Sequence, residues 1–334
     1  MTTANPFPDD PARELRSLLA AGRFQEALDR FREGDSALVH EPEGALLAAT
    51  AATRLGRYPE GVTLAEEALA QFRARGDRDG RMRSINLLGA IAWERGQLKE
   101  AESAWGDALE LARELDDSLM AARASNNLAS LAQLGERPEL ALSLYRSALI
   151  SYQRLGDRRG MAETHHNLGL VFRQSGRPQD ARETVEQAVR LADATSDESL
   201  RALALTGQAE LHLQLGDVAR ARQDASVAQQ LAVTSGDEVG AAEAGRLRAL
   251  VGLAEGDLEL ALSEAEAARN TAERHGSALL QGECAAAAAR VLHALGRLDD
   301  AERLRAEALG LFERLGAANW LRDFEAAWEE GGER

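Results

Sequence analysis

The sequence predicts an all-α protein built as a solenoid of about eight helix-turn-helix units with a C-terminal capping helix. Three observations predict this class. Glycine recurs at nearly constant spacing along the 334 residues. Alanine, leucine, glutamate and arginine, which all favour helices, are abundant. No segment shows the sustained apolar–polar alternation that strands require. A fixed period with two helical segments per unit indicates a repeat array.

Composition and charge argue against several classes of partner. The net charge is -16, whereas nucleic-acid affinity depends on many basic contacts to phosphate and anionic membranes attract basic segments. Cys284 is the only cysteine, so neither an internal disulfide nor a cysteine zinc motif is expected. The first residues, MTTANPFPDD, lack the charged and apolar regions of a signal peptide. We therefore expect a soluble cytoplasmic protein with no cofactor, no nucleic-acid partner and no membrane partner.

The chain divides into three segments at the level of organisation. Residues 1–9 are expected to form a flexible N-terminus, since prolines cluster at the start of the chain. Residues 10–316 carry the repeats. Residues 317–334 are expected to form the capping helix and a tail.

Two sets of regularly spaced residues mark the helix ends within the repeats. The first set is expected at the turn inside each unit: Gly22, Gly56, Gly96, Gly135, Gly176, Gly216, Gly256 and Gly296. The second set recurs every 40 residues at the border between units: Gly76, Asp116, Gly156, Ser196, Gly236, Gly276 and Gly316. Aspartate follows most members of the second set, which suits a left-handed helix end followed by an N-cap. In the stretch AQLGERP the turn is expected to shift by one residue.

Each unit has the periodicity of two amphipathic helices. In residues 82–111, Met82, Ile85 and Leu88 fall on one face by steps of three residues. Small residues recur at fixed columns, for example Gly89 in the first helix and Ala108 in the second. Small side chains allow neighbouring helices to approach closely, so these columns are expected to be packing positions.

The stretches RASNNLASL and LGDRRGMAETHHNLG resemble tetratricopeptide repeats. They are similar to the longer variety, of about forty residues, found in kinesin light chains and Leu-Gly-Asn repeat adaptors. The resemblance covers about residues 10–316. It implies a right-handed superhelix in which the first helix of each pair lines a concave groove.

Carried onto this chain, the resemblance implies a set of groove residues that would bind a peptide. Asparagine can bond peptide amides and arginine can pair with carboxylates. The candidates are Arg83, Asn86, Trp93, Arg123, Asn126, Asn127, His166, Asn167, Arg173 and Arg246. They could equally form an ordinary solvated helix face. Asn127 and Asn167 either reach the groove edge or brace the next repeat, and Trp93 is either a binding anchor or packed between repeats.

The adjacent histidines His165 and His166 suggest a metal or catalytic site at first sight. Consecutive helical residues point about 100° apart, so the two rings cannot readily bind one ion. By column, His165 is expected to be buried and His166 exposed. The best metal set would combine His166 with Glu163 and Glu210. No catalytic motif supports that set, and we expect neither a bound metal nor enzymatic activity.

Aromatic residues are concentrated near the C-terminus. Trp320, Phe324 and Trp328 are spaced four residues apart and would share one helix face. They are expected to cover the open end of the last repeat, or alternatively to form a contact in a homo-oligomer.

The function expected from the sequence is that of a non-enzymatic scaffold or adaptor. Its partner would be another protein or an extended peptide held in the groove, as solenoid curvature favours. Two alternatives stay open. One is a regulatory sensor for a short signalling peptide, similar to some bacterial regulators, although neither end appears long enough for a fused effector domain. The other is a structural protein that self-assembles through its ends.

Overall fold

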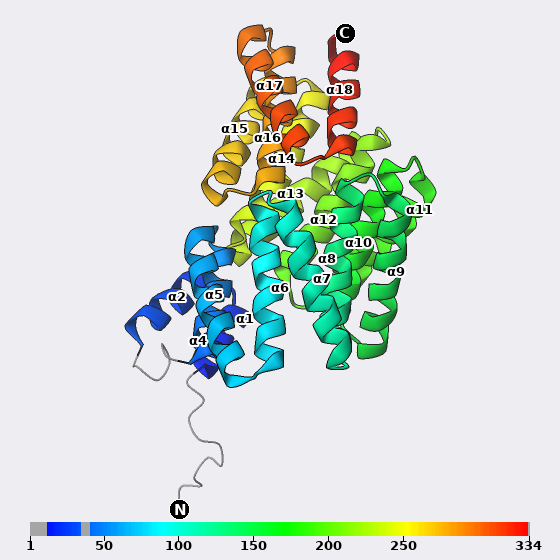
Figure 1. Cartoon of the computed structure of the whole chain (residues 1–334). Helices are drawn as coiled ribbons and strands as arrows, with labels where there is room; N and C mark the ends of the chain where they lie inside the picture. Colours follow the sequence, from blue (N-terminus) through cyan, green and yellow to red (C-terminus); the bar gives the residue numbers. More distant parts are fainter. Residues whose placement is uncertain (1–11, 35–40, 333–334) are drawn as a thin grey trace, which may run out of the picture. The chain divides into compact units, whose positions relative to one another are not determined.

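The structure, a computed structural model, describes residues 12–34 and 41–332, and the described elements are all helices. The expected flexible N-terminus at residues 1–9 lies outside them. Eight helix pairs, as predicted, are followed by one more helix (Figure 1). The pairs are α1 (Arg13–Ala20) with α2 (Phe24–Glu33), α4 (Pro42–Arg54) with α5 (Tyr58–Arg75), α6 (Arg78–Glu94) with α7 (Leu98–Glu114), α8 (Ser118–Leu134) with α9 (Pro138–Leu155), α10 (Arg158–Gln174) with α11 (Pro178–Asp193), α12 (Glu198–Gln214) with α13 (Val218–Ser235), α14 (Glu238–Glu255) with α15 (Leu258–His275), and α16 (Ala278–Ala294) with α17 (Leu298–Arg314); α18 is Ala318–Gly332.

The chain separates into two compact units. The first comprises residues 1–93 and 99–115, and the second comprises residues 94–98 and 116–334. In the second unit, the two helices of each pair pack against each other and against the neighbouring pair. This nearest-neighbour packing is what makes the fold a helical solenoid.

The turns inside the units follow the predicted positions with one correction. Glycines such as Gly96, Gly176 and Gly216 have φ near +70°, the left-handed region that ends a helix. In the AQLGERP stretch, however, Gly135 has φ −83° and Glu136 has φ 53°. The predicted one-residue shift is therefore wrong. The period of 40 residues is kept, and a glutamate occupies the position where the other units have glycine.

The predicted N-caps are confirmed in five consecutive units. In each, an aspartate at the border accepts a hydrogen bond from a backbone N–H two or three residues later, at 2.9–3.0 Å. These residues are Asp77, Asp117, Asp157, Asp197 and Asp237. Each bond satisfies an N–H that has no partner within its own helix, which fixes where the first helix of the unit begins.

Small residues at helix crossings set the spacing between pairs. The second-helix column that includes Ala108, Ala148 and Ala228 is fully buried. A Cβ atom on Gly160 would lie 2.5 Å from Cδ1 of Tyr152, the aromatic residue in the last turn of the preceding helix. Glycine is therefore required there because the ring occupies the space of a side chain.

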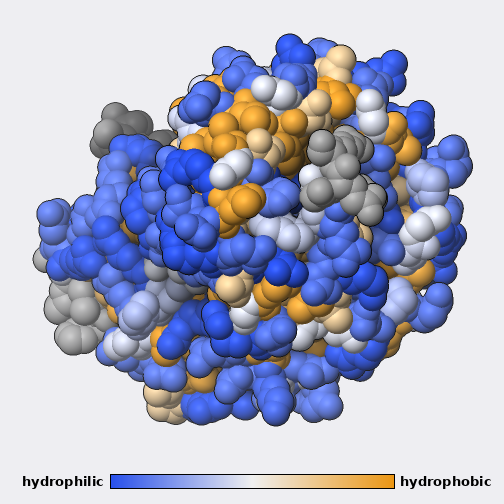
Figure 2. Space-filling model, turned by 90° about the horizontal axis from the view of Figure 1, so that it is seen from above, coloured by the Kyte–Doolittle hydropathy of each residue, from blue (hydrophilic) through white to orange (hydrophobic). Residues whose placement is uncertain are grey.

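Figure 2 shows one face, on which hydrophilic residues predominate and hydrophobic residues gather in smaller areas. None of the described helices is both long enough and apolar enough to cross a membrane.

Candidate functional site

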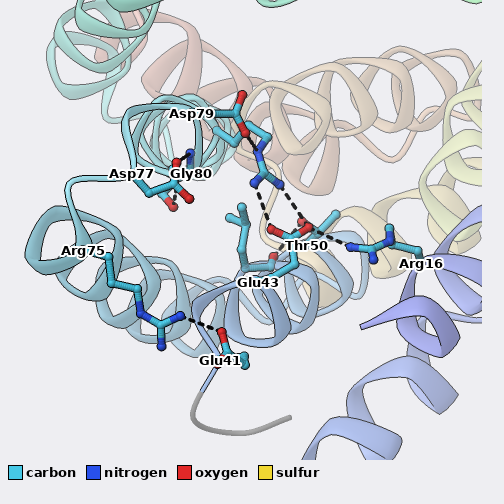
Figure 3. A network of polar contacts seen from close by, with 11 residues as sticks. Arg16, Glu41, Glu43, Thr50, Arg75, Asp77, Asp79 and Gly80 are labelled. Atoms are coloured by element: carbon cyan, nitrogen blue, oxygen red, sulfur yellow. Dashed lines mark hydrogen bonds and ion pairs between the residues drawn. The ribbon is translucent and has the colours of Figure 1, made fainter. Parts of the chain in front are cut away.

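In the first compact unit, the candidate Arg83 already has ion-pair partners. Its guanidinium donates two hydrogen bonds to Glu43, at 3.1 and 2.9 Å, and a third to Asp79 at 2.8 Å. Glu43 also accepts from Arg16, as Figure 3 shows. These pairs join α4 to α6, so Arg83 links two neighbouring repeats.

Asn86 and Trp93 lie further along α6 and are both half-buried. The Trp93 ring packs against Trp105, with ring centroids 6.1 Å apart. Trp105 Nε1 donates to the backbone carbonyl of Asn86 at 3.2 Å. Of the two interpretations of Trp93, the contacts favour packing. The Asn86 side chain keeps a buried Oδ1 that has no hydrogen-bond partner among the residues the structure describes.

In the second compact unit, the asparagine candidates on α8 and α10 are half-buried and Arg123 is exposed. Asn126 Oδ1 accepts a hydrogen bond from the Thr164 hydroxyl at 3.0 Å, which links α8 to α10. Asn127 and Asn167 share the next column. Within the described part of the chain, the one hydrogen-bond contact of the exposed Arg123 guanidinium runs from Nη1 to Met120 Sδ, at 3.8 Å.

The expectation of one buried and one exposed histidine is wrong, because both His165 and His166 are half-buried. The His166 ring lies over Gly207 of α12, where an added Cβ would be 2.7 Å from its Nδ1. Nδ1 of each ring is buried and has no hydrogen-bond partner in the described ranges 12–34 and 41–332. Burial lowers the pKa of both imidazoles, and Arg190 adds to this effect at His165. Gly207 leaves room for the His166 ring, which the alignment of His166 with polar residues did not show.

Four consecutive first helices place charged side chains along one line, which we call the charged row: Arg173 of α10, Glu210 of α12, Glu243 and Arg246 of α14, and Glu283 of α16. Arg246 Nη2 donates to Glu210 at 2.6 Å and lies 3.8 Å from Glu283. Arg173 Nη2 lies 3.4 Å from the other oxygen of Glu210. The pairs cross the borders between repeats, so they connect four successive repeats.

The environment shifts the pKa values within the charged row in opposite directions. Burial disfavours the Glu210 anion, but Arg173 and Arg246 outweigh burial and lower the pKa of this carboxyl to about 2. Burial raises the pKa of Glu243 to about 8, and the nearby Glu283 carboxylate adds to the effect. Glu210 is therefore ionised at neutral pH, while Glu243 holds a proton much of the time.

Helix α18 borders the charged row from the other side. Trp320 Nε1 donates to Glu283 at 3.0 Å, and Phe324 is buried against Phe312 with ring centroids 6.4 Å apart. The Trp328 ring packs against His293 in a tilted arrangement, with ring centroids 4.8 Å apart. The three aromatic residues are thus engaged within the chain, which favours the cap over the oligomer contact.

Helix α18 also contacts a repeat that is distant in the sequence but belongs to the same compact unit. Arg322 Nη1 donates to Glu136 at 2.6 Å, and Asn319 Nδ2 donates to the Gln133 carbonyl at 3.4 Å. Both contacts join positions 186 residues apart. Burial raises the pKa of Asp323, and Arg173 and Glu210 lie near enough for their charges to act on this carboxyl as well. Helix α18 therefore touches the end of α8 as well as α16 and α17.

The structure brings together His166, Arg173 and Arg246 of the predicted residues and adds Glu210, Glu243 and Glu283. At steps of 40 residues, all three glutamates fall on the helix face that carries the predicted groove residues. The 40-residue period was therefore the sequence signal for them. The contribution of α18 has no such signal, because it depends on how the units stack. The residues that the structure describes contain no group of three His, Cys, Asp or Glu side chains able to hold a metal ion.

A family model described as tetratricopeptide repeat matches residues 43–114, 120–194 and 160–232, together more than half of the chain. A second model with the same description matches residues 282–313. Comparison of the sequence with curated proteins gives no significant match.

Several solved structures share the fold. A Rap protein complexed with Competence and Sporulation Factor is 13% identical, with a TM-score of 0.61 over 97% of this chain and 98% of that chain. Aspartyl phosphate phosphatase F from Bacillus subtilis is 14% identical, with a TM-score of 0.62 over 91% and 84%. The protein NprR in complex with its cognate peptide NprX is 13% identical, with a TM-score of 0.62 over 97% and 98%.

Proposed function

The chain belongs to the tetratricopeptide repeat family, and we propose that it is a non-enzymatic scaffold whose first helices bind an extended peptide or protein segment. The binding face would be the stripe on α8, α10, α12, α14 and α16, bordered by α18. Solenoids commonly use such a continuous surface for extended partners.

The observation that carries this proposal is the charged row with its unused hydrogen-bonding capacity. Arg246 is only 9% exposed, and its Nε has no partner among the described residues. The half-buried Glu243 likewise forms no hydrogen bond or ion pair within them. Polar groups kept partly desolvated and incompletely bonded are costly unless a partner completes them. A peptide supplies both a carbonyl acceptor and N–H donors.

A sensor of a short peptide is the second candidate. It is supported by the likeness to NprR, which was solved with its cognate peptide and which matches nearly the whole chain. It is also supported by α18, which contacts both the charged row and, at Glu136, the repeat that contains α8. A sensor would change the contacts of α18 on binding, whereas a passive scaffold would leave them unchanged.

The first test is selection from a displayed library of short linear peptides, followed by affinity measurement with the labelled winners. Arg173→Ala removes a cation of the charged row, and Arg182→Ala removes an exposed arginine of α11 as the matched control. We expect the selected peptides to bind the Arg173→Ala protein about tenfold or more weakly, since a lost charge contact in a desolvated site weakens binding by that order. The control should bind like the wild type.

Equal affinity for both variants would place binding elsewhere on the chain, and a selection without any winner would contradict the peptide-binding proposal. Hydrogen exchange of residues 318–329 with and without peptide then separates the two candidates. Altered exchange indicates a sensor, and unchanged exchange indicates a scaffold.

A further inference from the structure

We infer that Glu243 and Glu283 form a subsite for the organic cation of a bound peptide, a lysine or arginine side chain or a free amino terminus. This inference rests on the proposed function and specifies the chemistry of its ligand. The two glutamates occupy the same position in consecutive units, on α14 and α16.

The first step concerns which carboxylates already have partners. Glu210 is neutralised from both sides by Arg173 and Arg246. Glu283 has only a distant approach from Arg246, at 3.8 Å, and one neutral hydrogen bond from Trp320. Glu243 has neither a hydrogen bond nor an ion pair among the described residues. Two of the three glutamates in the row therefore lack a full counter-charge.

The second step concerns the balance of charge around the row. Its cations are Arg173 and Arg246, while the carboxyl groups are Glu210, Glu243 and Glu283, with Asp323 contributed by α18. While Glu243 is protonated, the two arginines balance Glu210 and Glu283. When Glu243 ionises, the surplus is negative, so a cationic group that displaces its proton completes the row. A second carboxylate ligand would add to the repulsion.

The third step concerns Arg246, which lies one helical turn after Glu243. It is nine-tenths buried, yet only its Nη2 is bonded to a carboxylate, and its Nε lacks an acceptor. An extended peptide with a basic side chain matches both needs, since its backbone offers carbonyl oxygens and its side chain offers the cation. The orphan donor and the unpaired carboxylate thus point to the same ligand.

The environment of Glu243 supplies a second readout. The charges acting on it are Glu210 from α12, Asp237 and Arg246 from α14, and Glu283 from α16. On the other packed helices, Gln229 of α13 and Arg248 of α14 already bond Glu264 of α15. Because the pKa of Glu243 is raised to about 8, a bound cation would lower it and release a proton near neutral pH.

The experiment uses the full chain and a positional-scanning library of short peptides. Each position carries in turn lysine, arginine, the neutral isostere citrulline, or glutamate, and each peptide is made with a free and with an acetylated amino terminus. The test protein is the double variant Glu243→Gln/Glu283→Gln. The matched control is Glu259→Gln, an exposed glutamate of α15. Thermal melts confirm that all three proteins are folded.

The expected result is a preference of about tenfold or more for a cation over citrulline at one position. The double variant should lose this preference while binding the citrulline peptides as the wild type does. The acetylated series shows whether the cation is a side chain or the amino terminus. Calorimetry in buffers of different ionisation enthalpy should detect proton release on binding to the wild type and none to Glu243→Gln.

Two outcomes would overturn the inference alone: a preference that survives in the double variant, or peptide binding by the wild type without preference for a cation. Absence of all peptide binding would instead overturn the proposed function and this inference with it. If only Glu283→Gln melts normally, the single variant is used, and an unchanged preference in it counts against the subsite.

Discussion

At the scale of single residues, several polar side chains are partly buried. Side chains of the next repeat provide their hydrogen-bond or ion-pair partners. Arg83 is paired with Glu43, Asn126 with Thr164, and Glu210 with Arg246. Each partner lies about one repeat away. Removal of one partner leaves the other without its hydrogen bond or counter-charge. These residues therefore couple adjacent repeats as well as lining a face.

Glu243 is a carboxyl group whose charge is disfavoured by burial and by nearby carboxylates, and its substitution should stabilise the protein in alkaline solution. Its folded-state pKa is raised to about 8, above the value of an unfolded glutamate. Stability from its bound proton is therefore complete below about pH 4.5 and is lost as the pH rises through 8. Glu243→Gln should raise the free energy of unfolding by about 1–2 kcal/mol at pH 9 after allowance for its partial exposure.

Thermal melts of the wild type and Glu243→Gln between pH 5 and 9 check this prediction. The two curves should coincide at the acidic end and separate at the alkaline end. Glu259→Gln should follow the wild type throughout, and a Glu243→Gln protein that is less stable at every pH would contradict the assigned environment.

At the scale of elements, the helices and their starts could be predicted from the sequence because the signals are local. Asp157 lies at a helix start and bonds Gly160 N–H within three residues, so sequence spacing is enough. The turn at Glu136 was misplaced since Gly135 is the residue expected to adopt positive φ. Its neighbour adopts φ 53° instead, in keeping with the stacking of the units.

Part of the candidate site was also predictable, and the rest was not, for a related reason. The 40-residue columns placed Arg173 and Arg246 on one helix face. Arg246 is equivalent to His166, and His166 lies two helical turns before Arg173. Arg322 meets Glu136 across 186 residues, and no local pattern encodes that distance. The depth of His166 depends on Gly207 in the next unit, which the column of polar residues concealed.

The packing of an aromatic ring on a glycine gives a prediction for one helix crossing. Gly160→Ala would normally stabilise a helix by reducing the freedom of the unfolded chain. Here the new Cβ would lie 2.5 Å from the Tyr152 ring, so the ring or the helix must move, and stability should fall by about 1–3 kcal/mol.

Gly310→Ala in α17 is the matched control, because the nearest atom to its added Cβ is the end of Arg314, at 3.5 Å. It should raise stability by about 0.5–1 kcal/mol. Chemical denaturation of both variants measures the difference in sign. A Gly160→Ala protein as stable as Gly310→Ala would show that the aromatic ring has room to shift.

At the scale of the whole molecule, α18 contacts the end of α8, a helix of the same compact unit that lies several repeats earlier in the chain. The joining residue Glu136 has positive φ, which costs a residue with a side chain about 1 kcal/mol relative to glycine. Glycine would suit the backbone better, but it could not accept the hydrogen bond from Arg322.

Substitution of this glutamate by glycine should therefore separate backbone strain from the contact with α18. Glu136→Gly should leave the melting temperature unchanged or slightly higher, while hydrogen exchange in residues 318–329 becomes faster because Arg322 has lost its acceptor. Asp116→Gly is the control, since Asp116 also has positive φ and is not bonded to α18. Equal exchange in the two variants would show that α18 is held by its aromatic residues alone.

The contact between Arg322 and Glu136 also limits how the gene for this chain can change in length. An open array of repeats tolerates duplication or deletion of a unit, because each unit contacts only its neighbours. Between α8 and α18, an added or lost unit would carry Arg322 past its acceptor and move α18 off the α8 end. Growth or shrinkage of the array without this loss is confined to the units that precede α8.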